Sequence, residues 1–200
     1  MRSRYKTYIK YITFIAVGFF LLLEFVINKQ DILSNISYSV TITTFISIVY
    51  ANLLWKYNPL EKIPRLFKNY EGLFNSNYDN ESRKTHILIK QNLFQTQVFY
   101  KTEQTESNSI TSEILCENGH YYLYYTYRSE PKASVRGMND IHYGSVKLRI
   151  VDSKLLEGNY WTDRETTGQM TLNVILPKKN HKQNKIKNQS KSNIDENSAQ

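Results

Sequence analysis

The sequence predicts two membrane-spanning helices followed by a small all-β domain, an up-and-down antiparallel barrel of about eight strands. Two long apolar runs occupy the first part of the chain, and short runs of alternating polarity follow them. A polar, Lys-rich stretch closes the sequence. We therefore expect a transmembrane hairpin over residues 1–58, a β domain over 65–176 and a disordered basic tail over 177–200.

The first apolar run, residues 11–27, reads YITFIAVGFFLLLEFVI and is about long enough to span hydrocarbon. A signal peptide is the alternative, but no small-residue cleavage site follows the run. The second run, residues 36–55, is richer in Ser and Thr but carries no charge. The short gap between the two runs favours a helical hairpin.

Lys and Arg cluster on one side of the predicted hairpin, and only Lys29 lies between the spans. The clusters before and after the spans are Arg2, Arg4, Lys6 and Lys10, and Lys56, Lys62, Arg65 and Lys68. Positive charge stays on the cytoplasmic side of a membrane. We expect an inner-membrane protein with two spans, whose termini and β domain all face the cytoplasm.

Polar residues within the spans are candidates for membrane output, meaning the effect of the helices on the membrane. Glu24 either reaches solvent near the outer interface or contacts another helix or a water-lined pore. Asn52 and the face formed by Ser39, Thr43 and Ser47 could bond between helices in an oligomer. The hydroxyl groups could equally bond to their own helix backbone, which we favour slightly.

The β domain follows Pro59 and Pro64 and contains eight runs with the two-residue period of strands. Asn118-Gly119 and Asp152-Ser153-Lys154 predict tight turns between successive strands. Closure into a barrel would remove the exposed sheet edges, with a sandwich as the alternative. The expected strands are 66–74, 84–92, 94–101, 109–117, 120–128, 143–152, 156–164 and 168–175.

Motifs for catalysis are lacking: we find no Gly-rich phosphate loop, nucleophile elbow or metal-spaced cluster. His86, His120 and His142 have ordinary strand neighbours, and the single cysteine, Cys116, is expected to be a small packed side chain rather than a reactive thiol. We therefore predict no enzyme, no metal and no cofactor.

The β domain is rich in tyrosine and arginine, notably in residues 121–128 (YYLYYTYR) and 160–168 (YWTDRETTG). Aromatic rings stack on nucleobases, and guanidinium groups such as those of Arg136, Arg149 and Arg164 bind phosphates. Tyrosine is also a good strand former, so these rings could simply fill the barrel.

The layout resembles the two-transmembrane, β-strand-rich effectors of CBASS, a cyclic-oligonucleotide antiphage defence. The resemblance covers residues 5–176 and rests on loose motifs in a fixed order. These are Asn69-Tyr70-Glu71-Gly72, the Ser/Thr-rich segment 105–112, Leu123-Tyr124-Tyr125, His142-Tyr143-Gly144, and the spaced series from Leu156-Glu157-Gly158 through Tyr160, Thr162, Arg164 and Thr166 to Gly168.

That resemblance implies that a cyclic dinucleotide binds the barrel, that the protein self-associates, and that the helices disrupt the inner membrane in abortive infection. We expect no direct DNA or RNA binding. A constitutive membrane-anchored scaffold, which binds a protein or lipid and has a solid apolar barrel, is the alternative.

The ligand residues are our own inference from side-chain chemistry. We expect Arg164 to bind a phosphate, with Tyr160, Thr162 and Thr166 on the same face of a continuous strand. A structural turn at residues 162–164 is the alternative. Tyr125, Tyr127 and Arg149 are weaker candidates, chosen for side-chain type and for their place on adjacent strands. The tail, residues 177–200, is by default solvated, with weak attraction to anionic lipid as the alternative.

Overall fold

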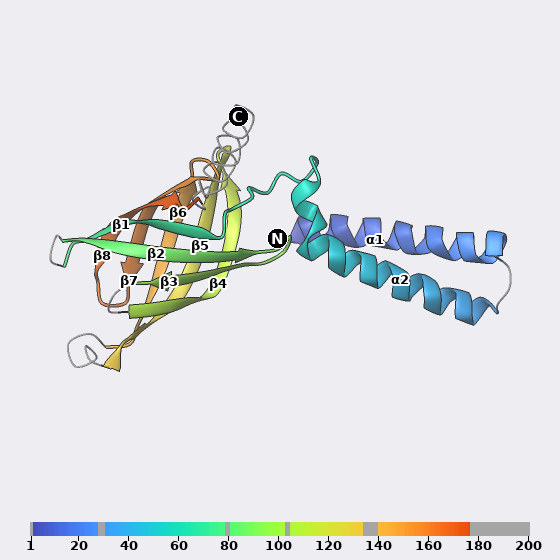
Figure 1. Cartoon of the computed structure of the whole chain (residues 1–200), viewed down its shortest axis with the longest axis horizontal. Helices are drawn as coiled ribbons and strands as arrows, with labels where there is room; N and C mark the ends of the chain where they lie inside the picture. The colour runs from blue at the N-terminus through green and yellow to red at the C-terminus, as the bar shows by residue number, and fades with distance from the viewer. Residues whose placement is uncertain (1, 28–30, 79–80, 103–104, 134–139, 177–200) are drawn as a thin grey trace, which may run out of the picture.

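Two helices project side by side from one end of an eight-stranded barrel (Figure 1). The computed structural model describes residues 2–27, 31–78, 81–102, 105–133 and 140–176. The predicted fold class is therefore confirmed. The predicted tail and Arg136, one of the arginines considered for phosphate binding, lie outside the described residues.

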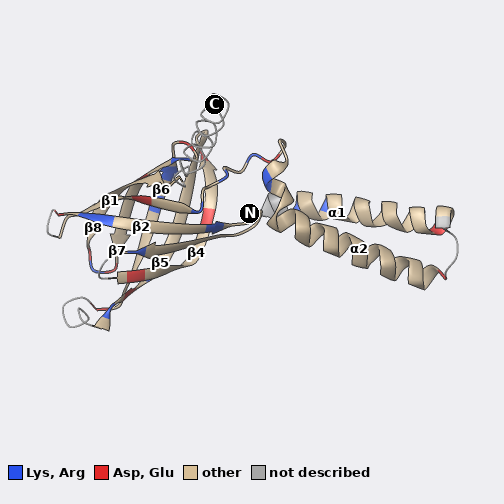
Figure 2. Cartoon of the chain, viewed as in Figure 1, with Lys and Arg blue, Asp and Glu red and all other residues tan. Residues whose placement is uncertain are grey.

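The helices are long and apolar enough, by length and composition, to cross a membrane. Helix α1 (Arg2–Leu22) continues as a π-helical turn, η1 (Leu23–Ile27), and helix α2 (Ile32–Asn52) is followed by a 3-10 turn, η2 (Leu54–Tyr57). The Asp31 carboxylate caps α2 by accepting a bond from the Ser34 N–H at 3.3 Å. Figure 2 shows charged residues at the two ends of this hairpin and an uncharged length between them.

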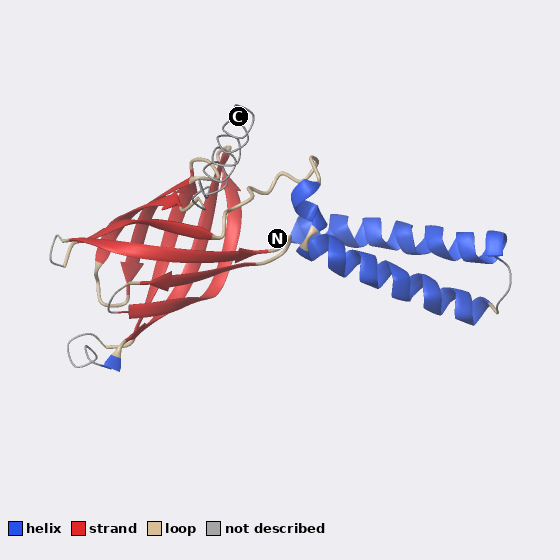
Figure 3. Ribbon diagram, viewed as in Figure 1, coloured by secondary structure: helices blue, strands red, loops and turns tan. Residues whose placement is uncertain are grey.

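Each strand pairs antiparallel with the next, and β8 pairs with β1 to close the barrel (Figure 3). The Asn118-Gly119 turn joins β4 to β5 with φ angles of 50° and 81°, as a two-residue hairpin turn requires. The strands are β1 (Asn69–Ser76), β2 (Ser82–Gln91), β3 (Thr96–Lys101), β4 (Thr105–Glu117), β5 (His120–Pro131), β6 (His142–Ile150), β7 (Leu155–Thr162) and β8 (Thr167–Val174).

The half of the barrel nearer the helices, which we call the hairpin end, has an apolar core. Side chains of alternate residues point inward from every strand, and the innermost are fully buried. They are Ile87, Val98, Leu123, Val146, Leu148, Leu156 and Leu172. Because these side chains point inward and those of their strand neighbours point outward, a one-residue slip in register would expose the whole set.

Tyr70 closes the hairpin end of this core. Its ring is fully buried, its hydroxyl donates to the Ser153 carbonyl at 2.6 Å and it accepts from the Phe67 N–H at 3.0 Å. One phenol thus links the segment that enters the barrel to the turn between β6 and β7.

The barrel contacts the hairpin through the turn between β2 and β3. The Leu93 N–H donates to the Ala51 carbonyl of α2 at 3.0 Å, and the Phe94 ring meets the Tyr8 ring of α1 edge to face at 4.7 Å. Trp55 is fully buried at the same place. These contacts join the hairpin to the barrel.

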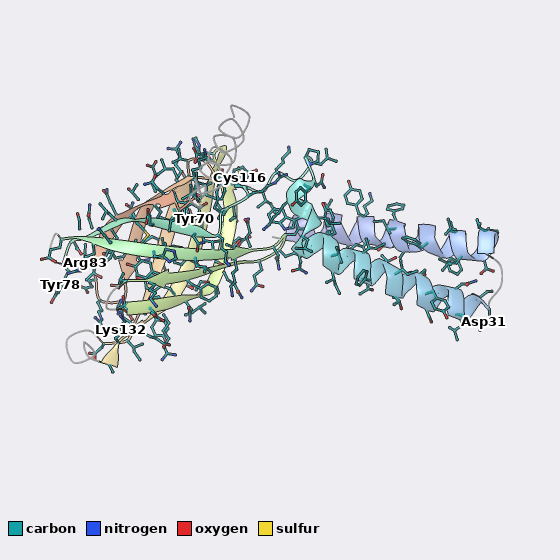
Figure 4. All side chains as sticks on the ribbon, viewed as in Figure 1. Asp31, Tyr70, Tyr78, Arg83, Cys116 and Lys132 are labelled. Carbon is teal, nitrogen blue, oxygen red and sulfur yellow. The ribbon has the colours of Figure 1, made fainter. Side chains whose placement is uncertain are left out.

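Two local expectations were wrong. Strand β7 ends at Thr162 rather than Arg164, because the chain turns there and Glu165 adopts a φ of 61°. Cys116 is exposed rather than packed, because it lies one residue before the end of β4 at the barrel rim (Figure 4).

Candidate functional site

The end of the barrel opposite the hairpin, which we call the far mouth, has a different interior. Four tyrosines from three strands, β3, β5 and β7, point inward there: Tyr100, Tyr125, Tyr127 and Tyr160. The Phe74 ring lies between two of them, 6.1 Å from the Tyr100 ring and 6.0 Å from the Tyr160 ring. The Tyr125 and Tyr127 rings are 6.2 Å apart. Their packing makes one aromatic cluster across the barrel.

Two glycines make room for these rings. A Cβ atom at Gly144 would overlap the Tyr127 ring, and one at Gly168 would overlap the Tyr160 ring and the Asn75 carbonyl. Gly144 faces Tyr127 across β5 and β6, and Gly168 faces Tyr160 across β7 and β8. Both glycines belong to the sequence motifs. These motif positions therefore leave the space that the two tyrosine rings occupy.

The phenols are held in their neutral form. Burial raises the pKa of Tyr125 well above its ordinary value of 10.0, with smaller contributions from Tyr127 and Tyr100. Burial likewise raises the pKa of Tyr100 and outweighs the Thr85 hydroxyl and the Arg83 guanidinium, which lower it. For Tyr127, burial comes first, followed by repulsion from Tyr160 and Asp163. Neutral phenols can donate and accept hydrogen bonds at the mouth.

Hydroxyl groups extend the polar lining. Ser107 and Ser129 face each other across β4 and β5, and each is 3% exposed. The Ser107 hydroxyl is buried and has no hydrogen-bond partner among the described residues. A buried polar atom without a partner costs free energy, so its retention in the barrel suggests a ligand or water that completes it.

Arg83 provides the guanidinium of the far mouth (Figure 4). It pairs with the inward-facing Phe74 across β1 and β2, and it pairs with the Glu81 carboxylate at 3.5 Å. Our site assignment from the sequence omitted Arg83, Thr85 and Tyr100. The alternation of Ile87 and Ile89, extended backwards by two steps, would have placed Thr85 and Arg83 inside the barrel.

An open cleft of about 660 Å³ lies near the far mouth, where β2 and β3 are no longer paired. Pairing between these strands ends at His86 and Lys101, so the first residues of β2 have no β3 partner. Three lysines and one glutamate contribute charge to the lining of the cleft. The lining residues are Glu71, Gly72, Leu73, Lys84, Thr85, His86, Lys101, Thr102 and Lys132. Thr85, which also lines the barrel interior, connects the cleft to the aromatic cluster.

The structure brings part of the predicted ligand set together. Tyr125, Tyr127 and Tyr160 share the interior of the far mouth, and Thr162 follows Tyr160 inward at the rim. Its hydroxyl lies 2.6 Å from the Thr166 hydroxyl. The predicted ligand set therefore clusters, apart from its two arginines.

Arg164 belongs to a turn, as the alternative interpretation held. Its N–H donates to the Thr162 hydroxyl at 3.2 Å, and its guanidinium donates to the Asp140 carbonyl. Arg149 lies on the outer face, because its neighbours Leu148 and Ile150 point inward. The guanidinium of Arg149 lies 3.4 Å from the His120 ring, near the hairpin end.

The two residues predicted for membrane output have different surroundings. The Asn35 amide of α2 donates to the Glu24 carboxylate of η1 at 2.9 Å, so Glu24 links the two helices. The Asn52 amide donates to the Ile48 carbonyl of its own helix. Within the described residues, no three His, Cys, Asp or Glu side chains are placed to hold a metal.

The fold and the far mouth together define an eight-stranded barrel with a polar, aromatic interior at one end, carried on two candidate membrane helices. Residues 61–174 match the family model described as "Cap15, cyclic dinucleotide receptor domain". CD-NTase-associated protein 15 of Staphylococcus schleiferi is 36% identical over 186 residues, which cover 88% of this chain and 100% of the relative.

Its namesake from Escherichia albertii is 26% identical over 80% of this chain and 86% of the relative. That from Yersinia aleksiciae is 32% identical over 44% of each. The chain belongs to the Cap15 family of CBASS effectors, and the resemblance stated from the sequence is confirmed.

Proposed function

We propose that the far mouth binds a cyclic dinucleotide and that this binding drives the membrane helices into a membrane-disrupting assembly. The observation that carries the proposal is the aromatic cluster with its partnerless Ser107 hydroxyl, in the domain that matches a cyclic dinucleotide receptor. The scaffold alternative requires a solid apolar interior, and the far mouth is instead lined by phenols, hydroxyls and Arg83.

The side chains divide by chemistry. A cyclic dinucleotide has two flat bases and two phosphodiesters. The rings of Tyr100 and Tyr127 offer π-faces to the bases, while Arg83 offers paired hydrogen bonds to a phosphate. Lys84 and Lys132 of the cleft attract the same anion electrostatically.

Within the ligand set inferred from the sequence, we retain four residues and reassign three. Tyr125, Tyr127, Tyr160 and Thr162 remain ligand residues. Thr166 and Arg164 shape the turn at the rim, where Arg164 tethers the β5–β6 segment. Arg149 is not part of the pocket, because its side chain is on the outer face.

Calorimetric titration of the full chain in detergent micelles tests the ligand. Cyclic di-GMP, cyclic di-AMP and cyclic GMP–AMP are the probes, and at least one should bind. Arg83→Gln should weaken that binding about tenfold or more, because a charged hydrogen bond is lost. The matched control is Arg128→Gln on the outer face, where Arg128 contacts Glu130 at 3.6 Å.

Tyr100→Leu and Tyr122→Leu form a second matched pair, and Tyr100→Leu should weaken binding because it removes a ring that offers a π-face to a base. Tyr122 lies on the outer face beneath the Lys147 ammonium, so its loss should leave binding unchanged. A folded protein that binds none of the three nucleotides would sink the ligand proposal. Equal effects of Arg83→Gln and Arg128→Gln would move the site away from the far mouth.

For the output, we propose an inner-membrane hairpin with both termini and the barrel in the cytoplasm. Ligand bound to the barrel favours a self-associated form, and the assembled helices permeabilise the membrane. Vesicles of phosphatidylethanolamine and phosphatidylglycerol that carry the protein should release trapped dye only after the nucleotide is added. Release that does not depend on the nucleotide would contradict this proposal.

We assign the chain no catalytic step and no cofactor. The nucleotide acts in this proposal as an activating ligand, whose binding energy is used to shift an equilibrium.

A further inference from the structure

The surface that α2 presents to α1 is polar. Asn35, Ser39 and Thr43 are 4%, 3% and 2% exposed, and Ser47, four residues further on, is half-buried. These four residues, spaced by four, form what we call the polar stripe. With a rise of about 1.5 Å per residue the stripe is roughly 18 Å long, more than half of a bilayer core.

The surface of α1 that covers the stripe is apolar. Its half-buried positions between Tyr8 and Glu24 carry only carbon side chains, namely Ile12, Ala16, Phe19, Phe20 and Leu23. The stripe therefore finds few partners on α1. Ser39 and Ser47 donate to carbonyl groups of their own helix, at 2.9 and 2.7 Å.

Thr43, at the centre of the stripe, has a hydroxyl that is buried without a hydrogen-bond partner among the described residues. In hydrocarbon such an atom is expensive, because no water completes it. Thr41, two residues away, faces outward and donates to the Ser37 carbonyl at 2.8 Å. Among the described residues of the hairpin, the Thr43 hydroxyl is therefore the one that is buried without a partner, at a place where an apolar side chain would pack better against α1.

Two contacts hold α1 over the stripe. At the outer end the Asn35 amide bonds to Glu24, and at the barrel end the Tyr8 hydroxyl donates to the Ser47 carbonyl at 2.8 Å. The Tyr8 ring also meets Phe94 of the barrel turn. A movement of that turn therefore acts directly on the contact that closes one end of the hairpin.

We propose that the polar stripe is a water-facing surface that α1 covers in this conformation, and that in the active assembly it lines a passage for small cations. Glu24 is the only charged residue in segments 11–27 and 32–55, and it lies at the outer end of the stripe. Carboxylates at a pore mouth favour cations. The inference rests on the proposed function, because only a permeabilising assembly has a passage to line.

Thiol accessibility tests the orientation of the stripe. In a Cys116→Ser background, Thr43→Cys and Thr41→Cys differ only in the face of α2 that carries the thiol. A membrane-impermeant thiosulfonate reacts with thiolates, which form in water rather than in lipid. After the activating nucleotide is added to vesicles, the thiol at position 43 should react at least about tenfold faster than the thiol at 41.

Isosteric removal of the hydroxyl gives an independent measurement. Thr43→Val improves the packing of the covered stripe and removes a polar group from the passage, so potassium flux should fall about fivefold. Thr41→Val should leave it unchanged. Glu24→Gln should reduce the preference for potassium over chloride, measured as the reversal potential in planar bilayers.

The outcomes separate the two proposals. Equal reactivity at positions 41 and 43, or equal flux through Thr43→Val and Thr41→Val, overturns the stripe while nucleotide-dependent dye release stands. A wild-type protein that binds nucleotide but releases no dye overturns both the membrane output and the stripe. Faster reaction at position 43 with reduced flux through Thr43→Val supports the passage.

Discussion

The barrel and the hairpin of this chain bury opposite kinds of side chain. The hairpin end of the barrel encloses Leu123, Leu148 and Leu172 and presents polar residues outward. The hairpin instead encloses Asn35, Ser39 and Thr43 and exposes Phe14, Phe25, Phe45 and other large apolar side chains. Each part of the chain buries the side chains that its surroundings solvate poorly. Water drives apolar groups into the barrel, whereas hydrocarbon solvates apolar groups and favours contacts of polar groups with one another.

The far mouth resembles the hairpin interior more than the barrel core. Each encloses a hydroxyl that finds no hydrogen-bond partner in the described part of the chain, at Ser107 and at Thr43. Polar groups at these two places weaken the packing that surrounds them. The apolar packing that stabilises the barrel is thus concentrated at the hairpin end, and we propose that the far mouth and the stripe serve ligand binding and membrane output.

Alkaline pH should lower the stability of the barrel more than any of the substitutions below. The pKa values of Tyr100, Tyr125 and Tyr127 are raised above 10.0 in the folded chain, so the unfolded chain loses these protons first and stability falls as pH rises through 10. One pH unit above that value, the loss is about 1.4 kcal/mol for each phenol, or about 4 kcal/mol for three. Denaturant titrations at stepped pH measure it.

Tyr125→Phe refines that test. Removal of one of these three phenols should lower their combined contribution to the pH dependence above pH 10 by about a third. A slope that does not change would mean that the Tyr125 phenol ionises in the folded barrel, contrary to its burial.

Leu123→Ala should remove about 3 kcal/mol of unfolding free energy, because it leaves a cavity at a position with no exposed surface. Leu73→Ala, at a side chain that is 49% exposed on the outer face, is the control and should cost about 0.5 kcal/mol or less. Chemical denaturation followed by circular dichroism compares the two. Similar costs would contradict the apolar core of the hairpin end.

Tyr70→Phe should cost about 2 kcal/mol, since it removes both hydrogen bonds of the buried phenol, to the Ser153 carbonyl and from the Phe67 N–H. Tyr78→Phe alters a ring that is 81% exposed and should be neutral. Thermal unfolding of both variants makes the comparison. A neutral Tyr70→Phe would mean that water replaces the phenol at both bonds.

Tyr8→Phe should have the smallest effect, about 0.6 kcal/mol, the typical value of a hydrogen bond between membrane helices. It keeps the ring that meets Phe94 and removes only the bond to Ser47. Tyr11→Phe, at a ring that is 64% exposed, is the control. Unfolding in mixed micelles, followed by energy transfer between labels on the two helices, measures the difference.

Much of the fold could be predicted from residue patterns. The two-residue alternation in runs such as Val146-Leu148-Ile150 predicts strands, and Asn118-Gly119 predicts a two-residue turn that pairs them. The end of β7 could not be predicted in the same way. Tyr160, Thr162, Arg164 and Thr166 keep the alternation through a turn, because the period describes side chains and says nothing about where the backbone reverses.

The site was predicted only in part. The tyrosines at 125, 127 and 160 were found by side-chain type. Gly144 and Gly168 were noted as motif residues, but their role in making room for tyrosine rings could not be read from the sequence. Arg149 was chosen for its charge, and its position on the outer face follows from a parity that Leu148 and Ile150 already carried. Tyr100 and Arg83 were missed because neither belongs to a conspicuous run.

By itself, the sequence determined the order of elements, the apolar length of the hairpin and the face of each strand, because these depend on local period and composition. Only the tertiary structure decided which strands meet and which residues share the far mouth. It also decided that α1 covers the polar stripe and that Phe94 reaches Tyr8. Barrel closure joins β8 to β1 across nearly the whole domain, and contacts at that separation follow from register and shape rather than from any local pattern.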